Sequence, residues 1–296
     1  MIIMALSIHT NYSALTTNTA LNKSNSALAT NQQRLGTGLR INSAADDAAG
    51  LQIATRLNAQ SRGMGVAMRN TGDATSMLQT AEGAFSELTD IVQRMKDLST
   101  QAANDTNSAD DRKSLSAEFN ELGKELTNIV SNTKYAGEAL FGVDGASGKF
   151  GTAGGIKFQI GSSAAETMTL DATTQLKAVT DALGALSAQF NATPAADTKL
   201  ETQATANGAI TLASTALDKI GSMRATLGSN INRLNHVNNN LANMKDNTEM
   251  AKGRIMDADF AVESANMSKN SMLMQSGISM LKQAGQMPGM VMGLLG

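Results

Sequence analysis

Apolar residues recur every three or four positions over long stretches of this chain, and almost no proline interrupts them. The longest of these stripes spans about seven helical turns and consists of Leu78, Ala81, Phe85, Leu88, Val92, Met95, Ser99 and Ala102. The two prolines of the chain, Pro194 and Pro288, lie outside this stretch, so no proline ring removes a helical hydrogen bond there. The spacing predicts an α-helix with one apolar face that packs against another element.

Two further stripes predict helices that cover the first. Asn104–Asn107 break the first pattern, and Ser108 is then placed to cap a second helix with Asp111 at the reciprocal capping position. The stripe of the second helix is Leu115, Phe119, Leu122, Leu126 and Ile129. The stripe of the third helix is Ile210, Ala213, Leu217, Ile220, Leu227, Ile231, Leu234, Leu241 and Met244. Because each helix buries its stripe only against the others, we expect a mainly α fold built on an elongated antiparallel helical bundle.

A glycine-rich segment, residues 142–161, separates the second helix from the third. Two short alternating runs, Lys157–Ile160 and Thr167–Leu170, predict a small β-hairpin. A weaker helix is expected at Thr174–Phe190, followed by a Pro/Ala/Thr-rich linker at Asn191–Thr198.

Both ends of the chain carry weaker patterns with a seven-residue period, which is typical of coiled coils. The N-terminal seam is assigned to one heptad frame, with Leu21 one residue off it: Ile8, Leu15, Leu28 and Leu35. The C-terminal seam also repeats at seven, with Ile278 on an adjacent row: Phe260, Met267, Met274 and Leu281. Asn, Ser and Thr crowd the N-terminal seam, and isolated helices are marginal in water. We therefore expect these arms to be disordered until a partner covers them, with each arm the natural partner of the other.

The C-terminal helix is expected to end near Pro288, which three glycines accompany.

The composition argues against catalysis. The chain has no cysteine and two histidines, His9 and His236, neither of which has a nearby Ser/Asp arrangement. We therefore predict no catalytic, cofactor or metal site, and infer that the chain is not an enzyme. The formal net charge of −2 argues against nucleic acid as a partner. No apolar run approaches the ~20 residues of a transmembrane helix, so no membrane partner is expected either.

Two groups of carboxylates are candidate sites. Asp46 and Asp47 are adjacent, so on a helix their side chains diverge by ~100° and do not share one substrate atom; we interpret them as helix-start charges or local salt bridges. Asp257, Asp259 and Glu263 lack the glycine and the spacing of a calcium loop, and we interpret them as a solvated or salt-bridged helix face.

Two segments at opposite ends of the chain carry a family resemblance. Residues 34–53 read RLGTGLRINSAADDAAGLQI, and residues 254–267 read RIMDADFAVESANM. Together they resemble the bacterial flagellins, the subunits of the flagellar filament. The resemblance covers residues 4–141 and 200–296, and the short segment between them implies a flagellin with little or no outer domain.

The resemblance implies a domain organisation and a function. Residues 1–44 and 255–296 would form a terminal coiled-coil inner domain, and residues 45–141 and 199–254 a helical middle domain that a hairpin and linker region, residues 142–198, completes. The chain would be a structural subunit, secreted through the flagellar type III apparatus, that self-assembles into the filament used for swimming or swarming. Its partners would be further copies of itself, an export chaperone, and the filament cap and hook-junction proteins.

Other functions remain open at this point. The alternative is a hook–filament junction protein, which shares the terminal pattern. An enzyme-bearing flagellin is disfavoured by the short central segment without His or Cys, and a secreted translocator by the lack of a long apolar hairpin.

A third segment carries a resemblance that concerns host recognition. Val92–Leu98 reads VQRMKDL and is similar to the flagellin segment that a Toll-like innate-immune receptor recognises. The similarity implies receptor contacts by Arg94, Leu98 and, on the next helix, Glu118. Lys96 and Asp97 replace the Arg and Glu usual there, which removes a planar hydrogen-bonding fork and shortens one acid. The alternative is that the same residues make axial contacts between subunits.

Overall fold

A computed structural model describes residues 11–191, 195 and 197–295. The contacts divide the chain into two compact units, one within residues 1–59 and 247–296 and the other within residues 60–246. Helix α2, Ala48–Ala102, and helix α5, Gln203–Met256, contribute to both units. The boundaries expected from sequence, at 44/45 and 254/255, lie inside the first unit, so the ends of α2 and α5 group with the terminal arms.

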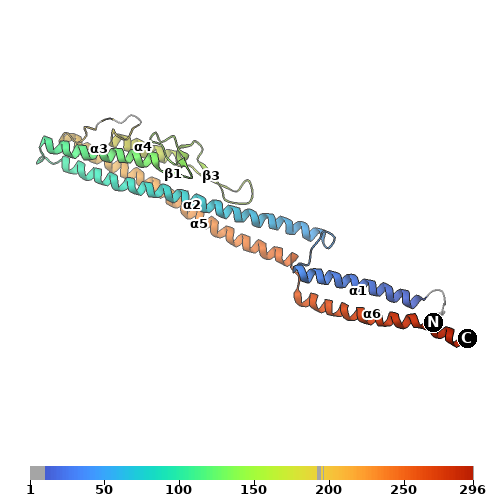
Figure 1. The fold of residues 1–296 in the computed structure, drawn as a ribbon. Coiled ribbons are helices and arrows are strands. Elements are labelled where there is room, and N and C mark those ends of the chain that lie inside the picture. The colour runs from blue at the N-terminus through green and yellow to red at the C-terminus, as the bar shows by residue number, and fades with distance from the viewer. Residues whose placement is uncertain (1–10, 192–194, 196, 296) are drawn as a thin grey trace. The chain divides into compact units, whose positions relative to one another are not determined.

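The core of the second unit lies between α2, α5 and helix α3, Ala109–Asn132, which run alongside one another (Figure 1). Every residue of the predicted α2 stripe is buried, as are five of the predicted α5 stripe: Ala213, Ile220, Leu227, Leu234 and Leu241. An ion pair joins the two long helices, because Arg224 donates from Nε and Nη2 to Glu82 Oε1 at 3.1 and 2.7 Å. The helical periodicity of the sequence is thus confirmed as the pattern of burial.

The start of α3 is the capped turn that the sequence predicts. Asp111 N donates to Ser108 Oγ at 3.2 Å, and Ser108 N donates back to Asp111 Oδ2 at 2.9 Å. Arg112 Nε donates to the Ala102 carbonyl at 2.9 Å and so satisfies the last turn of α2. These bonds hold the reversal between α2 and α3 because they supply partners to the free groups of both helix ends.

The predicted β-hairpin is confirmed. Strands β3, Ile156–Gln159, and β4, Thr167–Leu170, are antiparallel with Phe158 opposite Met168. A smaller hairpin, β1 at Lys134–Tyr135 and β2 at Glu138–Ala139, was not predicted. Its two-residue loop has positive φ at both Ala136 and Gly137, the geometry of a type I′ turn. The sequence signal there is weak because an Ala occupies the position where Asn or Asp is usual.

Helix α4 is shorter than expected. It spans Thr173–Leu186 and follows strand β4, while the short 3₁₀ helix η1, Lys149–Gly151, precedes strand β3. The prediction extended it to Phe190, which was wrong, because Ser187 is extended and the chain then turns to bury the Phe190 ring. The apolar residue at the end of the pattern belongs to the core but not to the helix.

In the first unit, helix α1, Tyr12–Thr37, and helix α6, Phe260–Leu295, lie side by side (Figure 1). They are antiparallel, since Asn11 at one end of α1 contacts Ala284 and Arg34 at the other end contacts Glu263. The segment that joins α1 to α2 and the segment that joins α5 to α6 pair through an isolated β-bridge between Leu39 and Asp257. Among the described residues, no helix is long and apolar enough to cross a membrane.

The heptad assignment at the N-terminus needs correction. Leu15 and Leu28 are 13 residues apart, one short of two heptads. Leu21, Leu28 and Leu35 share the frame and are half-buried against α6, whereas Leu15 is 60% exposed. Ile8 lies outside the described residues. On α6, Met267, Met274 and Leu281 are half-buried on the seam, and Phe260 is 57% exposed.

Helix α6 does not end near Pro288, so that prediction was wrong. It continues to Leu295. A proline inside a helix deprives the carbonyl four residues earlier of its donor, which here is the carbonyl of Ala284. Asn11 Nδ2 from the other arm donates to that carbonyl at 2.7 Å, so the missing hydrogen bond is replaced by one between the arms.

Candidate assembly and recognition surfaces

The largest exposed apolar residues of the described chain gather on the two terminal arms. Eight of them lie on α1 and α6 and are between 43% and 71% exposed: Tyr12, Leu15, Phe260, Val262, Met272, Leu273, Ile278 and Met280. A two-helix pair covers one face of each helix and leaves the other to solvent. This concentration of exposed apolar residues on two helices makes the arms a candidate interaction surface.

The covered face of the arm pair is mixed in character. Besides the leucines and methionines of the seam, it buries Asn31 and Glu263, each 7% exposed. Arg34 Nη1 donates to Glu263 Oε1 at 2.9 Å. These polar residues were not recognised as a site in the sequence. The available signal was that Arg34 and Glu263 fall within the two segments of family resemblance.

The predicted receptor residues are only partly on the surface. Arg94 and Glu118 have side chains that are 55% and 46% exposed, and Arg94 donates from both Nε and Nη2 to Glu118 Oε1 at 2.9 and 2.7 Å. Leu98 is 1% exposed and belongs to the core, so the predicted surface contact through its side chain is corrected. Leu98 follows Met95 by three residues, which is the spacing of the buried stripe.

The carboxylates in the two segments of family resemblance are used within the chain. Asp46 Oδ2 accepts from the backbone N–H groups of Ser43 and Asn42 at 2.9 and 3.0 Å, and these bonds, that of Ser43 first, hold the pKa of Asp46 below its ordinary value. Asp47 caps α2 by accepting from Gly50 N at 2.8 Å. The interpretation of this pair as local helix-start charges is confirmed.

The second carboxylate group also separates into individual roles. Asp259 caps α6 by accepting from Ala261 N at 2.9 Å, Asp257 lies in the β-bridge, and Glu263 pairs with Arg34. Among the described residues, no three His, Asp or Glu side chains are grouped to hold a metal ion.

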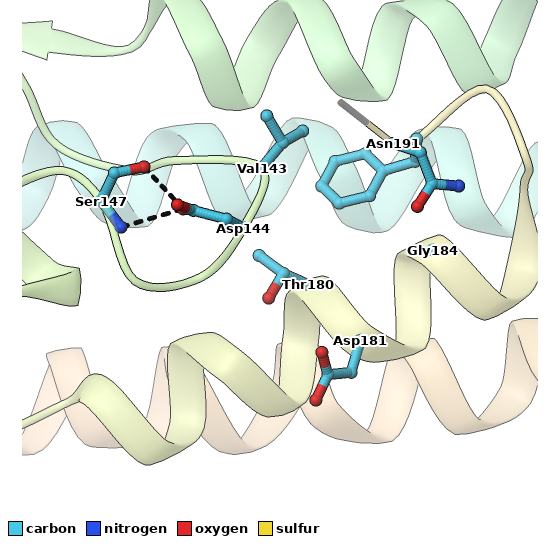
Figure 2. A pocket seen from close by; sticks show the side chains of 8 residues that line it. Val143, Asp144, Ser147, Thr180, Asp181, Gly184 and Asn191 are labelled. Carbon is cyan, nitrogen blue, oxygen red and sulfur yellow. Dashed lines mark hydrogen bonds between the residues drawn. The ribbon is translucent and has the colours of Figure 1, made fainter. Parts of the chain in front are cut away.

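An open depression of about 500 Å³ lies between the Val143–Ser147 loop and α4 (Figure 2). Its two carboxylates already have partners. Asp144 Oδ1 accepts from Ser147 Oγ and N at 2.5 and 2.9 Å, and the hydroxyl bond is the main cause that lowers the Asp144 pKa. Asp181 accepts from Lys177 Nζ at 3.0 Å. The two carboxylates are thus used within the loop and within α4.

Long helices with exposed apolar residues and internally paired charges are typical of a structural protein, and comparison with known proteins identifies its family. A family model described as the bacterial flagellin N-terminal helical region matches residues 8–145, and the bacterial flagellin C-terminal helical region matches residues 210–295. The chain belongs to the bacterial flagellins. It is a structural subunit of the extracellular flagellar filament, and no comparison favours a hook-junction protein.

Individual relatives match along the full chain. Flagellin A of Vibrio anguillarum is 37% identical over 379 aligned positions, which cover 99% of this chain and 100% of the relative. Flagellin A of Vibrio cholerae is 34% identical over 378 positions, and polar flagellin C of Vibrio parahaemolyticus is 33% identical over 391, with the same coverage. The alignments contain more positions than this chain has residues, so the relatives carry residues without a counterpart here. The crystal structure of Bacillus cereus flagellin is 36% identical and covers 58% of this chain and 88% of that chain, with a TM-score of 0.46.

Proposed function

We propose that the terminal arms α1 and α6 assemble the filament by folding and packing together with the arms of neighbouring subunits. The observation that carries the proposal is the concentration of exposed apolar residues on these two helices. Burying one methionine or leucine stabilises by about 1.5–3 kcal/mol, so neighbours that cover this surface supply the free energy that an isolated pair lacks. The contacts are heterologous and do not close, which produces a helical filament.

Truncation tests the proposal most directly. Chains that lack residues 4–40 or 260–296 are expected to remain helical by circular dichroism and to form no filaments by electron microscopy after salt-induced polymerisation. Filaments of ordinary appearance from either truncated chain would contradict the role of the arms.

A finer test leaves both arms in place. Met272→Gln/Met280→Gln removes apolar surface from the exposed face of α6 and is expected to raise the protein concentration needed for polymerisation. Ser264→Ala/Lys282→Ala, at exposed polar positions on another side of the same helix, is the matched control and should leave that concentration unchanged.

The same face of α6 fits an export chaperone before assembly. Methionine side chains adapt to differently shaped partners because they are flexible and polarisable, and Met272 and Met280 are 71% and 60% exposed. We expect the chaperone to co-elute with the intact chain and not with Met272→Gln/Met280→Gln. Secretion through the type III apparatus, and contacts with cap and hook-junction proteins at the ends of the filament, belong to the same proposal, since the arms are unpaired on one side wherever the polymer ends.

For host recognition, Arg94 and Glu118 are the residues that a Toll-like receptor could contact from solvent. Truncation of an arginine that is a hot spot of an interface costs about 2 kcal/mol or more, whereas a rim charge costs less. We therefore expect Arg94→Ala to reduce receptor signalling strongly and Glu118→Ala less. The measurement is a reporter-cell assay on purified monomer, with circular dichroism to verify folding. Lys113→Ala, at an exposed ion pair on the same helix as Glu118, is the control. Undiminished signalling by folded Arg94→Ala/Glu118→Ala would reject this surface.

A further inference from the structure

A polar layer interrupts the seam between the two arms. It is defined by Asn31 and Arg34 on α1 and by Glu263 and Asn270 on α6. Besides the Arg34–Glu263 ion pair, Asn31 has contacts on both sides when its amide is oriented to satisfy both ends. Its Nδ2 then donates to Glu263 Oε2 at 3.1 Å, and its Oδ1 accepts from Asn270 Nδ2 at 3.1 Å. Both carboxylate oxygens of Glu263 are therefore hydrogen-bonded inside the seam.

The apolar part of the seam does not choose a register. Three residues on each arm repeat every seven positions: Leu21, Leu28 and Leu35 on α1, and Met267, Met274 and Leu281 on α6. Sliding one arm by a heptad brings equivalent residues into the same positions and keeps two of the three apolar layers, so the seam alone distinguishes registers weakly. At one end of the pair, the backbone bonds from Arg40 N to the Met256 carbonyl and from Ala258 N to the Gly38 carbonyl, 2.6 and 2.9 Å long, also oppose the slide. The same slide moves a residue by about 10.5 Å along the helix axis, which separates Arg34 from Glu263.

The polar layer, in contrast, loses its contacts when one arm slides by a heptad. Glu263 and Asn31 would remain within a helix pair without the partners that satisfy them, which is strongly unfavourable for a buried charge. A second contact far along the pair has the same property. Asn11 Nδ2 donates to the Ala284 carbonyl at 2.7 Å, and that carbonyl lacks a helical donor because Pro288 has no N–H.

The polar layer contributes little net free energy to holding the two arms together. Arg34 Nε is buried and has no hydrogen-bond partner, and a buried ion pair is often no more stabilising than apolar residues of similar volume. We propose that the polar layer selects the register in which α1 pairs with α6, while the apolar seam supplies the attraction. The inference rests on the proposed role of the arms in assembly and names Arg34 and Glu263 as its specificity-determining residues.

The register can be measured by disulfide trapping, because the chain has no cysteine of its own. A Cβ placed at Gly277 lies 3.9 Å from the Cβ of Leu21, within the range of about 3.5–4.5 Å for a disulfide. Leu21→Cys/Gly277→Cys therefore reports the observed register. Leu28→Cys/Gly277→Cys and Ala14→Cys/Gly277→Cys report slides of one heptad in either direction.

Filaments assembled from each double-cysteine variant are oxidised. The cross-linked chains are then quantified by their mobility on a gel, which separates links within a chain from links between chains. With the polar layer intact, the observed-register pair should cross-link at least about tenfold more than either shifted pair. With Asn31→Leu/Arg34→Met/Glu263→Leu, the ratio of shifted to observed cross-links should rise at least about tenfold, because the apolar residues keep the arms together while the main cost of the shifted registers is removed. An unchanged ratio would overturn the proposal.

The matched control replaces an exposed ion pair outside the arms. Lys124 and Glu121 are 2.6 Å apart and more than half exposed, so Lys124→Met/Glu121→Leu should leave the cross-link ratio as it is. Co-assembly with an excess of unsubstituted chain keeps each variant measurable if it polymerises poorly alone.

A charge exchange provides the second test. Arg34→Glu alone places two acids together and should abolish the observed-register cross-link, whereas Arg34→Glu/Glu263→Arg should restore most of it. An exchange that performs no better than the single substitution would reject the proposal. Filaments from truncated chains would instead contradict the role of the arms, so the two failures are distinguishable.

Discussion

The middle unit, residues 60–246, and the terminal arms use the same helical period but bury it to different extents. In the middle unit, stripe residues such as Phe85, Leu88 and Ile220 are at most 1% exposed. In the arms the seam residues are only half-buried, and residues of the same chemical type, such as Leu15 and Met272, are mostly exposed. Periodicity therefore predicts a helix and its apolar face, but not whether the chain itself covers that face.

The number of helices that meet at a core explains the difference. In the middle unit α2, α3 and α5 enclose a common core, and α4 with the hairpin β3–β4 adds to it. In the arms two helices meet along one line, and each keeps an apolar side toward solvent. A unit of the first kind is stable alone, and one of the second kind gains stability from association.

Amide hydrogen exchange should show the largest contrast between the two regions. In the verified monomer we expect exchange across residues 12–37 and 260–286 to be about a thousandfold or more faster than at residues 78–102, since the arms open without unfolding the core. The measurement is exchange detected by mass spectrometry. Equal protection of amide hydrogens in the arms and in the core of the monomer would contradict the difference between the two regions. Protection of the arms in the filament is the internal control.

Core truncation should affect the two regions unequally. Phe85→Ala removes a ring that is 1% exposed and lies 4.9 Å from the ring of Phe141, and we expect a loss of about 3–5 kcal/mol in the free energy of unfolding. Leu15→Ala should change that free energy by less than about 0.5 kcal/mol, although it should weaken polymerisation. Chemical denaturation of the monomer measures the first effect and sedimentation of filaments the second. Similar denaturation midpoints for both variants would contradict the comparison.

Helix caps give a smaller and closely matched test. Ser108 caps α3 and Asn11 caps α1, where its Oδ1 accepts from Ala14 N at 3.0 Å. Ser108→Ala should lower the stability of the monomer by about 1 kcal/mol. Asn11→Ala should leave the unfolding midpoint unchanged, because α1 does not belong to the unit that unfolds cooperatively. A lowered midpoint for Asn11→Ala would show that the arms are part of that unit.

Acid titration should show the smallest effect. The Ser108 hydroxyl and backbone N–H bonds hold the pKa of Asp111 below its ordinary value. A carboxyl with a lowered folded-state pKa stabilises the fold above its unfolded pKa, ~3.9, and loses that contribution as the pH falls through the folded value. Asp111→Asn should therefore be less stable than the unsubstituted chain at pH 7 and equal to it below the folded pKa. Denaturation midpoints at several pH values measure this difference, and one that persisted in strong acid would exclude the ionised cap as its cause.

The sequence predicted where most of the candidate surface lies, but not which of its residues are buried or paired. The segments at 34–53 and 254–267 located both arms. The separate similarity at Val92–Leu98 suggested Arg94, Leu98 and Glu118, of which the structure finds Arg94 and Glu118 exposed and paired and Leu98 buried. The sequence did not reveal the polar layer. Asn31 reads as an ordinary polar position on a weak helix, and the interpretation of Glu263 as part of a solvated or salt-bridged helix face named no partner for it. The sequence also did not single out Asp197, because that residue lies in a segment predicted to be a linker. In the structure Asp197 is 5% exposed and accepts a hydrogen bond from Ala188 N at 2.8 Å.

The sequence by itself determined the helices, their apolar faces, the α3 cap and the β3–β4 hairpin, because these depend on short-range spacing and local hydrogen bonds. Only the tertiary structure decided that α6 continues past Pro288, that Leu21 and not Leu15 faces the partner arm, and that Leu98 is inside. Each of these outcomes depends on a group distant in sequence: the Asn11 amide that replaces a lost helical donor, the α6 surface that selects one face of α1, and the neighbouring helices that enclose the α2 stripe. A local pattern offers alternatives of nearly equal free energy, and the long-range contacts choose among them.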